Sequence, residues 1–239
     1  MTLLALHAVS KSYGALKVTD DITLAVTEGE TLGILGPNGA GKTTLFNLIS
    51  GDVRVDAGRV EYAGRDVTRL KPHQRCHAGI GRSYQVPQPF GNMSVFENLV
   101  TAACFGGQQT EREAWQTAHE VLEQTGLMAH ANKPAGGLTL LDRKRLELAR
   151  ALATRPQLLL LDEIAGGLTE PEAAVLVGEL KRIKARGVTM IWIEHVVHAL
   201  LSLADRLFVI NFGQKLAEGA PLVVMNDPEV RRVYMGMEA

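Results

Sequence analysis

The stretch Gly36-Pro-Asn-Gly-Ala-Gly-Lys-Thr-Thr44 fits the phosphate-binding pattern G-x-x-x-x-G-K-[ST] and decides how the rest of the sequence is interpreted. It follows Glu30–Leu35, a short apolar run that is typical of a buried strand. It leads into Lys42–Ser50, where apolar residues recur at the spacing of a helix. Strand, glycine loop and helix is the order that the pattern requires. The stretch therefore predicts that the protein binds ATP or GTP.

Each part of this loop has a role in holding a triphosphate. The glycines Gly36, Gly39 and Gly41 allow backbone N–H groups to turn toward phosphate oxygens at the N-terminus of a helix. Lys42 supplies a positive charge for the β- and γ-phosphates, and the Thr43 hydroxyl suits Mg²⁺. The remaining members of the predicted phosphate site are Pro37, Asn38, Ala40 and Thr44.

Composition narrows the class of protein. The chain has 239 residues, of which 46% are hydrophobic, and this is enough to bury a substantial core. A net charge of −1 gives no general reason to bind nucleic acid. No apolar stretch approaches the roughly 18 residues that span a bilayer, and the two cysteines do not form a disulfide framework. We expect a soluble, cytoplasmic, globular protein.

The order of the predicted elements indicates an α/β fold. Strands are predicted at 3–9, 22–26, 31–35, 60–63, 158–161, 188–193 and 206–210, and helices at 94–105, 111–125 and 171–186, with a further helix around 146–153. The catalytic core, a mixed sheet with an antiparallel β subdomain near the N-terminus, is expected in 1–91 and 156–239. A helical subdomain is expected in 92–155.

A second motif ends in two carboxylates. Leu158-Leu-Leu-Leu-Asp-Glu163 is an apolar strand followed by Asp162 and Glu163. In a protein with a phosphate-binding loop, Asp162 would help to hold Mg²⁺ and Glu163 would orient or deprotonate the attacking water. Taken alone, such a run is often only a strand that reaches solvent. Its position downstream of the loop favours the catalytic interpretation.

Two further residues lie at the ends of predicted strands. Gln85 closes Gly81-Arg-Ser-Tyr-Gln85, where its amide would bind Mg²⁺ or water, or cap a turn. His195 follows the apolar run 188–193, at the carboxyl end of a strand where ligands gather in open α/β sheets. A lone histidine is usually structural, and the residues alone leave both roles open.

These motifs together give the chain a resemblance to a known family. The whole chain resembles an ATP-binding cassette ATPase, the nucleotide-binding subunit of a transporter. Its matching pieces occur in the family's order. Tyr13 in Lys11-Ser-Tyr-Gly14 resembles the aromatic residue that stacks on adenine, Gly36 to Thr44 resembles the Walker A loop, and Gln85 resembles the Q-loop glutamine. Leu158 to Glu163 resembles the Walker B motif, and His195 resembles the switch histidine that contacts the γ-phosphate.

The resemblance is closest to the branched-chain amino acid importer branch of that family. It rests on Asn92-Met-Ser-Val-Phe-Glu-Asn98, Ile193-Glu-His195 and Val233-Tyr-Met-Gly236. The resemblance implies hydrolysis of ATP with Mg²⁺ held by Thr43, Gln85 and Asp162. It implies a second ATPase subunit, membrane permeases and, indirectly, an extracytoplasmic solute-binding protein as partners, at the cytoplasmic face of the inner membrane. Branched-chain amino acids are the expected cargo.

The main departure from the family pattern lies in the signature segment. The family's signature Leu-Ser-Gly-Gly-Gln aligns with Leu138-Thr-Leu-Leu-Asp142, where only the leucine and the hydroxyl of Thr139 remain. In the family, this segment reaches the γ-phosphate of a partner's ATP. Here Leu140 and Leu141 limit close backbone approach, and Asp142 brings a negative charge near a triphosphate. Alternatively, Thr139 and Asp142 form a capping box for the following helix.

Three other functions remain open at this point. The altered signature favours a degenerate, regulatory cassette paired with a more competent ATPase. A non-transport cassette usually carries two cassettes or a coiled-coil insert, whereas this sequence has one cassette and no heptad run. A P-loop kinase explains the glycine loop but leaves the ordered matches at Tyr13, Gln85 and His195 unexplained.

Overall fold

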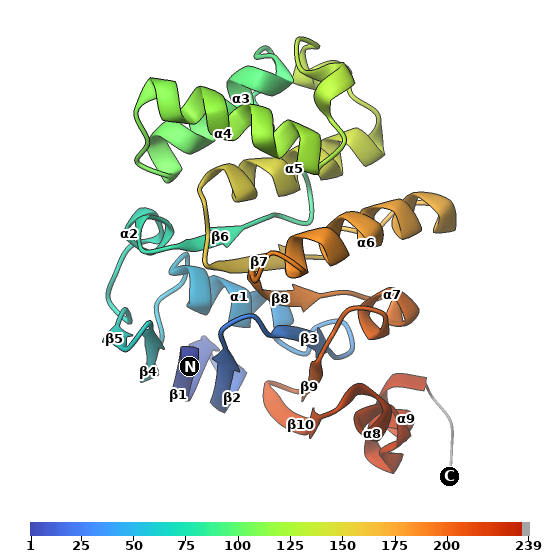
Figure 1. The fold of residues 1–239 in the computed structure, drawn as a ribbon. Coiled ribbons are helices and arrows are strands. Elements are labelled where there is room, and N and C mark those ends of the chain that lie inside the picture. Colours follow the sequence, from blue (N-terminus) through green and yellow to red (C-terminus); the bar gives the residue numbers. More distant parts are fainter. Residues whose placement is uncertain (236–239) are drawn as a thin grey trace. The chain divides into compact units, whose positions relative to one another are not determined.

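The computed structural model describes residues 1–235 and divides into two compact units (Figure 1). The first unit contains Met1–Arg75 and the chain from Ile191 onward, and the second contains Cys76–Met190. The second unit includes all of the expected helical subdomain, 92–155, together with flanking strands and a helix. Residues 236–239 of the expected domain, including Gly236 of the resemblance, lie outside the described residues.

An antiparallel sheet forms the N-terminal part of the first unit (Figure 1). Its strand order is β2-β1-β4-β5, with β1 at Thr2–Tyr13, β2 at Leu16–Thr27, β4 at Ala57–Tyr62 and β5 at Arg65–Asp66. In β2, the buried side chains of Ile22, Leu24 and Val26 alternate with exposed ones, as expected for a strand with one face on a core. The predicted strands at 3–9, 22–26 and 60–63 are confirmed.

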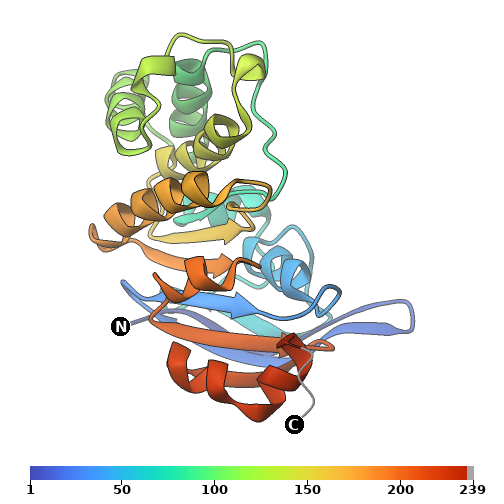
Figure 2. The ribbon, with the colours of Figure 1, turned by 90° about the vertical axis from the view of Figure 1, so that its right-hand side faces the viewer.

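The first unit also contains a second set of strands. Strand β3 (Thr31–Leu35) pairs in parallel with β9 (Arg206–Asn211), and β10 (Gln214–Gly219) pairs antiparallel with β9. All five residues of β3 are buried, which explains its unbroken apolar character. The short helix α7 spans Val197–Leu201, and the C-terminal helices α8 (Pro221–Asn226) and α9 (Pro228–Met235) pack beside β10 (Figure 2).

The glycine loop joins β3 to helix α1 (Lys42–Ser50), so the predicted order of strand, loop and helix is confirmed. The residue before the helix is Gly41, with a φ of +105°. A Cβ atom at Gly41 would lie 2.4 Å from the Val18 carbonyl oxygen. A side chain at Gly41 is therefore excluded for two reasons, which are the positive φ angle and the nearby carbonyl of Val18.

The opposite end of α1 is held by a buried arginine. Arg75, in helix α2 (Pro72–His77), is 1% exposed, and its Nη1 donates to the carbonyls of Leu48 and Ile49 at 2.6 and 2.8 Å. Its Nη2 and Nε donate to the carbonyls of Thr68 and Leu70. The last carbonyls of a helix lack intrahelical donors and carry partial negative charge, so a guanidinium there satisfies both needs.

The second unit contains short parallel strands. Strand β6 (Ile80–Arg82) pairs with β7 (Leu158–Asp162), with Ile80 opposite Leu158. The division between the units falls within β8 (Thr189–Ile193). Every residue of β7 and of β8 is buried, which accounts for the apolar runs that predicted these strands.

The helices of the second unit are α3 (Val95–Thr101), α4 (Glu111–Gln124), α5 (Leu140–Ala153) and α6 (Glu170–Lys184). Capping boxes start three of them, at Ser94, Thr110 and Thr169. Two 3₁₀ turns lie at Met128–His130 and Ala135–Gly137. The helix predicted at 94–105 is confirmed, but its second half is not α-helical. It changes to a π-helix at Ala102–Gly106, where the Gly107 N–H donates to the Ala102 carbonyl five residues back.

Replacing the buried arginine tests its role at the end of α1. Arg75→Met leaves buried carbonyls without a donor, so we expect the free energy of unfolding to fall by about 3 kcal/mol. Arg59→Met, at an exposed position of β4, is the matched control and should cost less than about 0.5 kcal/mol. Urea unfolding measures both. Equal losses for the two variants would contradict the assigned role.

The loop glycines give a second matched pair. Gly39 has a φ of +79° with no atom within 4 Å of an added Cβ, whereas Gly41 has both a positive φ and the Val18 carbonyl nearby. We expect Gly39→Ala to lower the free energy of unfolding by about 1 kcal/mol, and Gly41→Ala to lower it by about 3 kcal/mol. If urea unfolding gave the same loss for both, the close approach to Val18 would not limit this position.

Candidate nucleotide site and its relatives

The lysine of the glycine loop lies against its own loop. Lys42 is 6% exposed, and its Nζ donates to the carbonyls of Gly36 and Pro37 at 2.7 and 2.9 Å. The positive charge is therefore already held over the loop by neutral carbonyl oxygens. Phosphate oxygens are stronger acceptors for an ammonium than neutral carbonyls. This arrangement suits a lysine whose ammonium exchanges carbonyl oxygens for phosphate oxygens.

The start of α1 is also suited to an anion. No side chain caps it, and its first turn contains no acidic residue. The first N–H groups of a helix lack intrahelical acceptors and carry partial positive charge. Asn38, Gly39 and Thr43 are exposed, Thr44 is partly exposed, and Ala40 is buried. The loop thus combines exposed backbone with a helix N-terminus, which is the arrangement that binds phosphate.

Two more predicted residues belong to the first unit. Tyr13 ends β1 with half of its surface exposed, and the Lys11 ammonium lies 5.5 Å from the centre of its ring. Lys11 is itself held by Asp56 at 2.6 Å. His195 follows β8 and is exposed, while the carboxylate of Glu194 accepts its backbone N–H at 3.0 Å. Both residues therefore lie at the surface of the first unit.

The second unit brings the predicted carboxylates and the glutamine together. Asp162, the last residue of β7, is 3% exposed and lies 3.3 Å from Nη2 of Arg82. Nε2 of Gln85 donates to Oε2 of Glu163 at 2.5 Å. Glu163 has a φ of +46°, which is uncommon for a residue with a side chain. Such backbone strain is concentrated at functional sites.

The expected location of Gln85 at the end of a strand is wrong. Strand β6 ends at Arg82, and Gln85 lies three residues farther along in an irregular segment. The pairing with β7 extends by one more hydrogen bond, from Ser83 N–H to the Leu160 carbonyl. Tyr84 and Gln85 are exposed beyond it. The buried part of the sheet has therefore ended before these two residues.

A lysine that sequence reasoning missed joins the same cluster. Lys144 of α5 is 4% exposed, and its Nζ donates to the carbonyls of Gln85 and Glu163 at 2.7 and 3.1 Å. In the sequence it lies between two arginines at the start of a helix, a pattern typical of a solvated face. Only the placement of two distant carbonyls next to it distinguishes Lys144 from its neighbours.

The segment that departs from the family signature caps α5. Thr139 is the N-cap residue, and its Oγ1 accepts the Asp142 N–H at 3.2 Å. The same hydroxyl donates to Oδ2 of Asp142 at 2.8 Å. The capping interaction that was predicted as an alternative is therefore present, although the Asp142 carboxylate accepts the hydroxyl rather than the backbone N–H of Thr139. Leu140 remains 45% exposed.

The Asp142 carboxylate lies beside two basic side chains of the second unit. Arg145 Nη1 lies 3.3 Å from its Oδ1, and His130 Nε2 lies 3.5 Å from its Oδ2. Arg145 also donates to Glu179 of α6 at 2.7 Å. Burial raises the pKa of the Glu179 carboxyl above its ordinary value, and hydrogen bonding to Arg145 partly offsets the rise. Asp142 therefore has a basic side chain near each carboxylate oxygen, and it shares Arg145 with Glu179.

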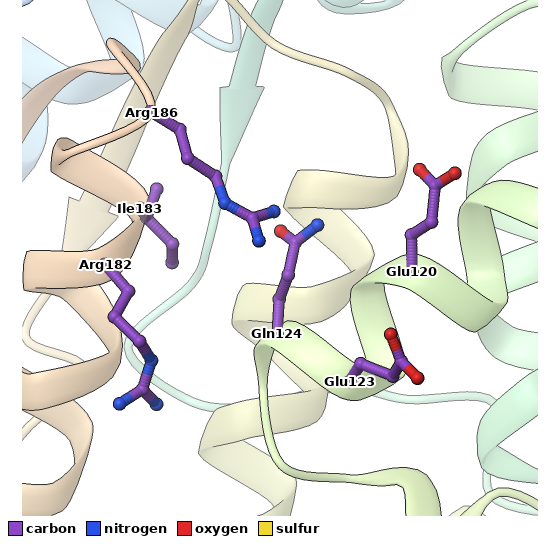
Figure 3. Close-up of a pocket in the computed structure, with 6 residues that line it drawn as sticks. All are labelled: Glu120, Glu123, Gln124, Arg182, Ile183 and Arg186. Carbon is purple, nitrogen blue, oxygen red and sulfur yellow. The ribbon is translucent and has the colours of Figure 1, made fainter.

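A pocket of about 410 Å³ in the second unit contains none of the predicted site residues. Figure 3 shows its walls, which bring Glu120, Glu123 and Gln124 of α4 opposite Arg182, Ile183 and Arg186. Two carboxylates and two guanidinium groups leave this pocket without a net positive charge for a triphosphate. The glycine loop and the Gln85–Glu163 pair, rather than this pocket, have the chemistry that a nucleotide requires.

Comparison with known families agrees with this chemistry. Residues 19–166 match the model of the ABC transporter family, which covers more than half of the chain. Residues 214–236 match a model described as "Branched-chain amino acid ATP-binding cassette transporter". The first match includes the glycine loop, Gln85, the signature segment and both carboxylates, and the second falls at the C-terminal end.

Individual relatives align over nearly the full chain. The protein is 34% identical to the high-affinity branched-chain amino acid transport ATP-binding protein LivG of Salmonella typhimurium, with 98% of each chain covered. It is also 34% identical to the lipopolysaccharide export system ATP-binding protein LptB of Haemophilus influenzae, covering 99% of this chain and 98% of the relative. The crystal structure of the ADP conformation of MJ1267, an ATP-binding cassette of an ABC transporter, superposes with a TM-score of 0.88 at 32% identity, covering 99% of this chain and all of that one.

One assignment follows from the glycine loop before α1, the carboxylates at and after the end of β7, and the relatives that match from end to end. The chain belongs to the ABC transporter family, as an ATP-binding cassette ATPase.

Proposed function

We propose that this protein is the ATP-hydrolysing subunit of an ABC importer and that ATP is the common ligand of the residues described above. The amides of Gly39 to Thr44 and the Lys42 ammonium would hold the phosphates. Tyr13 would stack on adenine, and His195 would donate a hydrogen bond to the γ-phosphate. The observation that carries the hydrolytic part is the direct hydrogen bond between Gln85 and Glu163. It gives the carboxylate a defined orientation.

The oxygen atoms in these residues fit Mg²⁺, which prefers oxygen ligands in octahedral geometry. Thr43 is an exposed residue at the start of α1, and Asp162 is the last residue of β7. Nε2 of Gln85 donates to Glu163, which leaves the amide oxygen as the end that accepts a cation. Thr43, Asp162 and Gln85 would hold the ion. When bound, it would neutralise charge on the β- and γ-phosphates.

Glu163 would act as the general base. Its carboxylate would accept a proton from a water molecule as the water oxygen forms a bond to the γ-phosphorus. The bond between that phosphorus and the β–γ bridging oxygen breaks, and the products are ADP and phosphate. Gln85 would hold the carboxylate in place through the hydrogen bond described above. Asp162 keeps a different environment, beside Arg82, which suits a ligand rather than a base.

Partners would complete the site and the transporter. We propose a head-to-tail dimer with a second ABC ATPase, in which Thr139 contacts the γ-phosphate of ATP held by the other subunit. The ion pair between Asp142 and Arg145 supports this contact, because it moderates the negative charge of the altered signature. Among residues 1–235, no helix is long and apolar enough to cross a bilayer. Membrane permeases, and indirectly an extracytoplasmic solute-binding protein, would provide the path for the solute.

The proposed cargo is a branched-chain amino acid. The match of residues 214–236 to the branched-chain amino acid model and the similarity to LivG support it. The equal identity to LptB gives a second candidate, lipopolysaccharide export. The proposed location is the cytoplasmic face of the inner membrane, where either cargo would require the ATPase.

Replacing the proposed base tests the hydrolytic mechanism. Glu163→Gln keeps the shape of the side chain but removes its ability to accept a proton, so kcat should fall at least about 100-fold while ATP stays bound. Glu123→Gln, an exposed position on α4, is the control. Steady-state ATPase assays and retention of labelled ATP during gel filtration measure the two effects. Wild-type turnover by the Glu163 variant would disprove the role of Glu163.

Transport assays in cells test the cargo. Deleting the gene should abolish most high-affinity uptake of labelled leucine, isoleucine and valine, because no other subunit would supply energy to these permeases. The wild-type gene should restore uptake, and a Lys42→Ala allele, which lacks the charge for the phosphates, should not. Normal uptake combined with lipopolysaccharide retained in the inner membrane would favour the second candidate instead.

A further inference from the structure

Three residues from separate parts of the second unit form a closed ring of hydrogen bonds. Lys144 Nζ donates to the Gln85 carbonyl at 2.7 Å and to the Glu163 carbonyl at 3.1 Å. Gln85 Nε2 donates to Glu163 Oε2 at 2.5 Å and closes the ring. Lys144 lies in α5, Gln85 follows β6 and Glu163 follows β7. The ring therefore ties together three chain segments through polar groups alone.

Because Lys144 is buried, its ammonium depends on hydrogen-bond acceptors in the protein. The residue is 4% exposed, although lysine is rarely buried unless its charge is satisfied. An ammonium that is removed from water needs acceptors in fixed places, and the two carbonyls provide them. Moving either carbonyl away would leave a buried charge with fewer acceptors. Lys144 thus resists any change in the separation of Gln85 and Glu163.

The backbone of Glu163 has a strained conformation that Lys144 helps to hold. Its φ of +46° is a conformation that residues with side chains seldom adopt. The carbonyl of Glu163 accepts hydrogen bonds both from Lys144 and from the Gly166 N–H, at 3.1 Å each. Surrounding contacts must sustain such a strained conformation. Lys144 is one of those contacts, and it acts on the residue that carries the proposed base.

We infer that Lys144 is a positioning residue for ATP hydrolysis: it holds the backbones of Gln85 and Glu163 so that the carboxylate faces the attacking water. The inference rests on the proposed function of Glu163. Lys144 acts through the two carbonyls and makes no contact with ATP. It also connects hydrolysis to α5, because the helix that contains it begins at Thr139, the residue proposed to contact a partner's nucleotide. A shift of α5 would be transmitted to both carbonyls.

Three variants test this inference in the full-length protein. Lys144→Met removes the ammonium with a side chain of similar length, and Lys144→Arg keeps a charged donor. Lys181→Met, at an exposed position of α6, is the matched control. We expect Lys144→Met to lower kcat at least tenfold with KM for ATP within twofold of wild type. Lys144→Arg should recover kcat to within about threefold, and Lys181→Met should leave both parameters unchanged.

The split between kcat and KM separates positioning from a general loss of structure. Rates are expressed per nucleotide-binding site, counted by titration with a fluorescent ATP analogue, so unfolded protein does not contribute. If Lys144→Met does not fold, Lys144→Gln takes its place under the same criteria, because its shorter side chain does not reach both carbonyls. An equal loss of kcat in the Arg and Met variants, or a rise in KM alone, would overturn the inference.

The same assays distinguish failure of this inference from failure of the proposed function. If the wild-type protein hydrolyses ATP and Glu163→Gln does not, but the Lys144 variant turns over at the wild-type rate, only the role of Lys144 is wrong. If Glu163→Gln hydrolyses ATP normally, the proposed mechanism fails and the inference fails with it.

Discussion

Helix α1 follows a glycine beside which there is no room for a side chain, and this constraint determines the geometry of the phosphate loop. A Cβ atom at Gly41 would lie 2.4 Å from the Val18 carbonyl oxygen, so the chain enters the helix through a close backbone approach that glycine permits. The helix start then has backbone N–H groups and no side-chain cap. At the other end, Arg75 satisfies the final carbonyls. The helix is therefore closed at its C-terminus and available to an anion at its N-terminus.

The second unit holds the proposed catalytic carboxylate on a residue whose backbone conformation is strained. Glu163 follows a fully buried strand, and its φ is positive. A strained residue would relax unless several contacts opposed the change. Its side chain is held by Gln85 and its carbonyl by Lys144. These contacts come from different segments, so the orientation of the carboxylate depends on the packing of the whole unit.

In the altered signature segment, neighbouring residues change the physical effect of the aspartate at position 142. A negative charge at Asp142 looks unfavourable for a segment that approaches a triphosphate. In the folded protein, the carboxylate accepts the Thr139 hydroxyl and lies beside Arg145. Arg145 in turn pairs with Glu179 on another helix. The aspartate is therefore part of a local network that stabilises the start of α5. The exposed Leu140 remains the larger departure from the family pattern.

The sequence by itself determined the strand, loop and helix around Gly36 to Thr44, the buried strand before Asp162 and the family. These features depend on spacing and apolar runs within short segments, which local hydrogen bonding and burial translate directly into structure. The roles of Gln85 and His195 were open from the residues alone, and the single helix predicted at 94–105 missed the π-helical turn. Only the tertiary structure decided which polar side chains are buried and what they contact. Lys144 and the Gln85 carbonyl are 59 residues apart, and Arg75 and the Leu48 carbonyl are 27 apart. No local pattern encodes such pairs, because a lysine or arginine has the same appearance in a sequence whether folding brings carbonyls to it or leaves it in water.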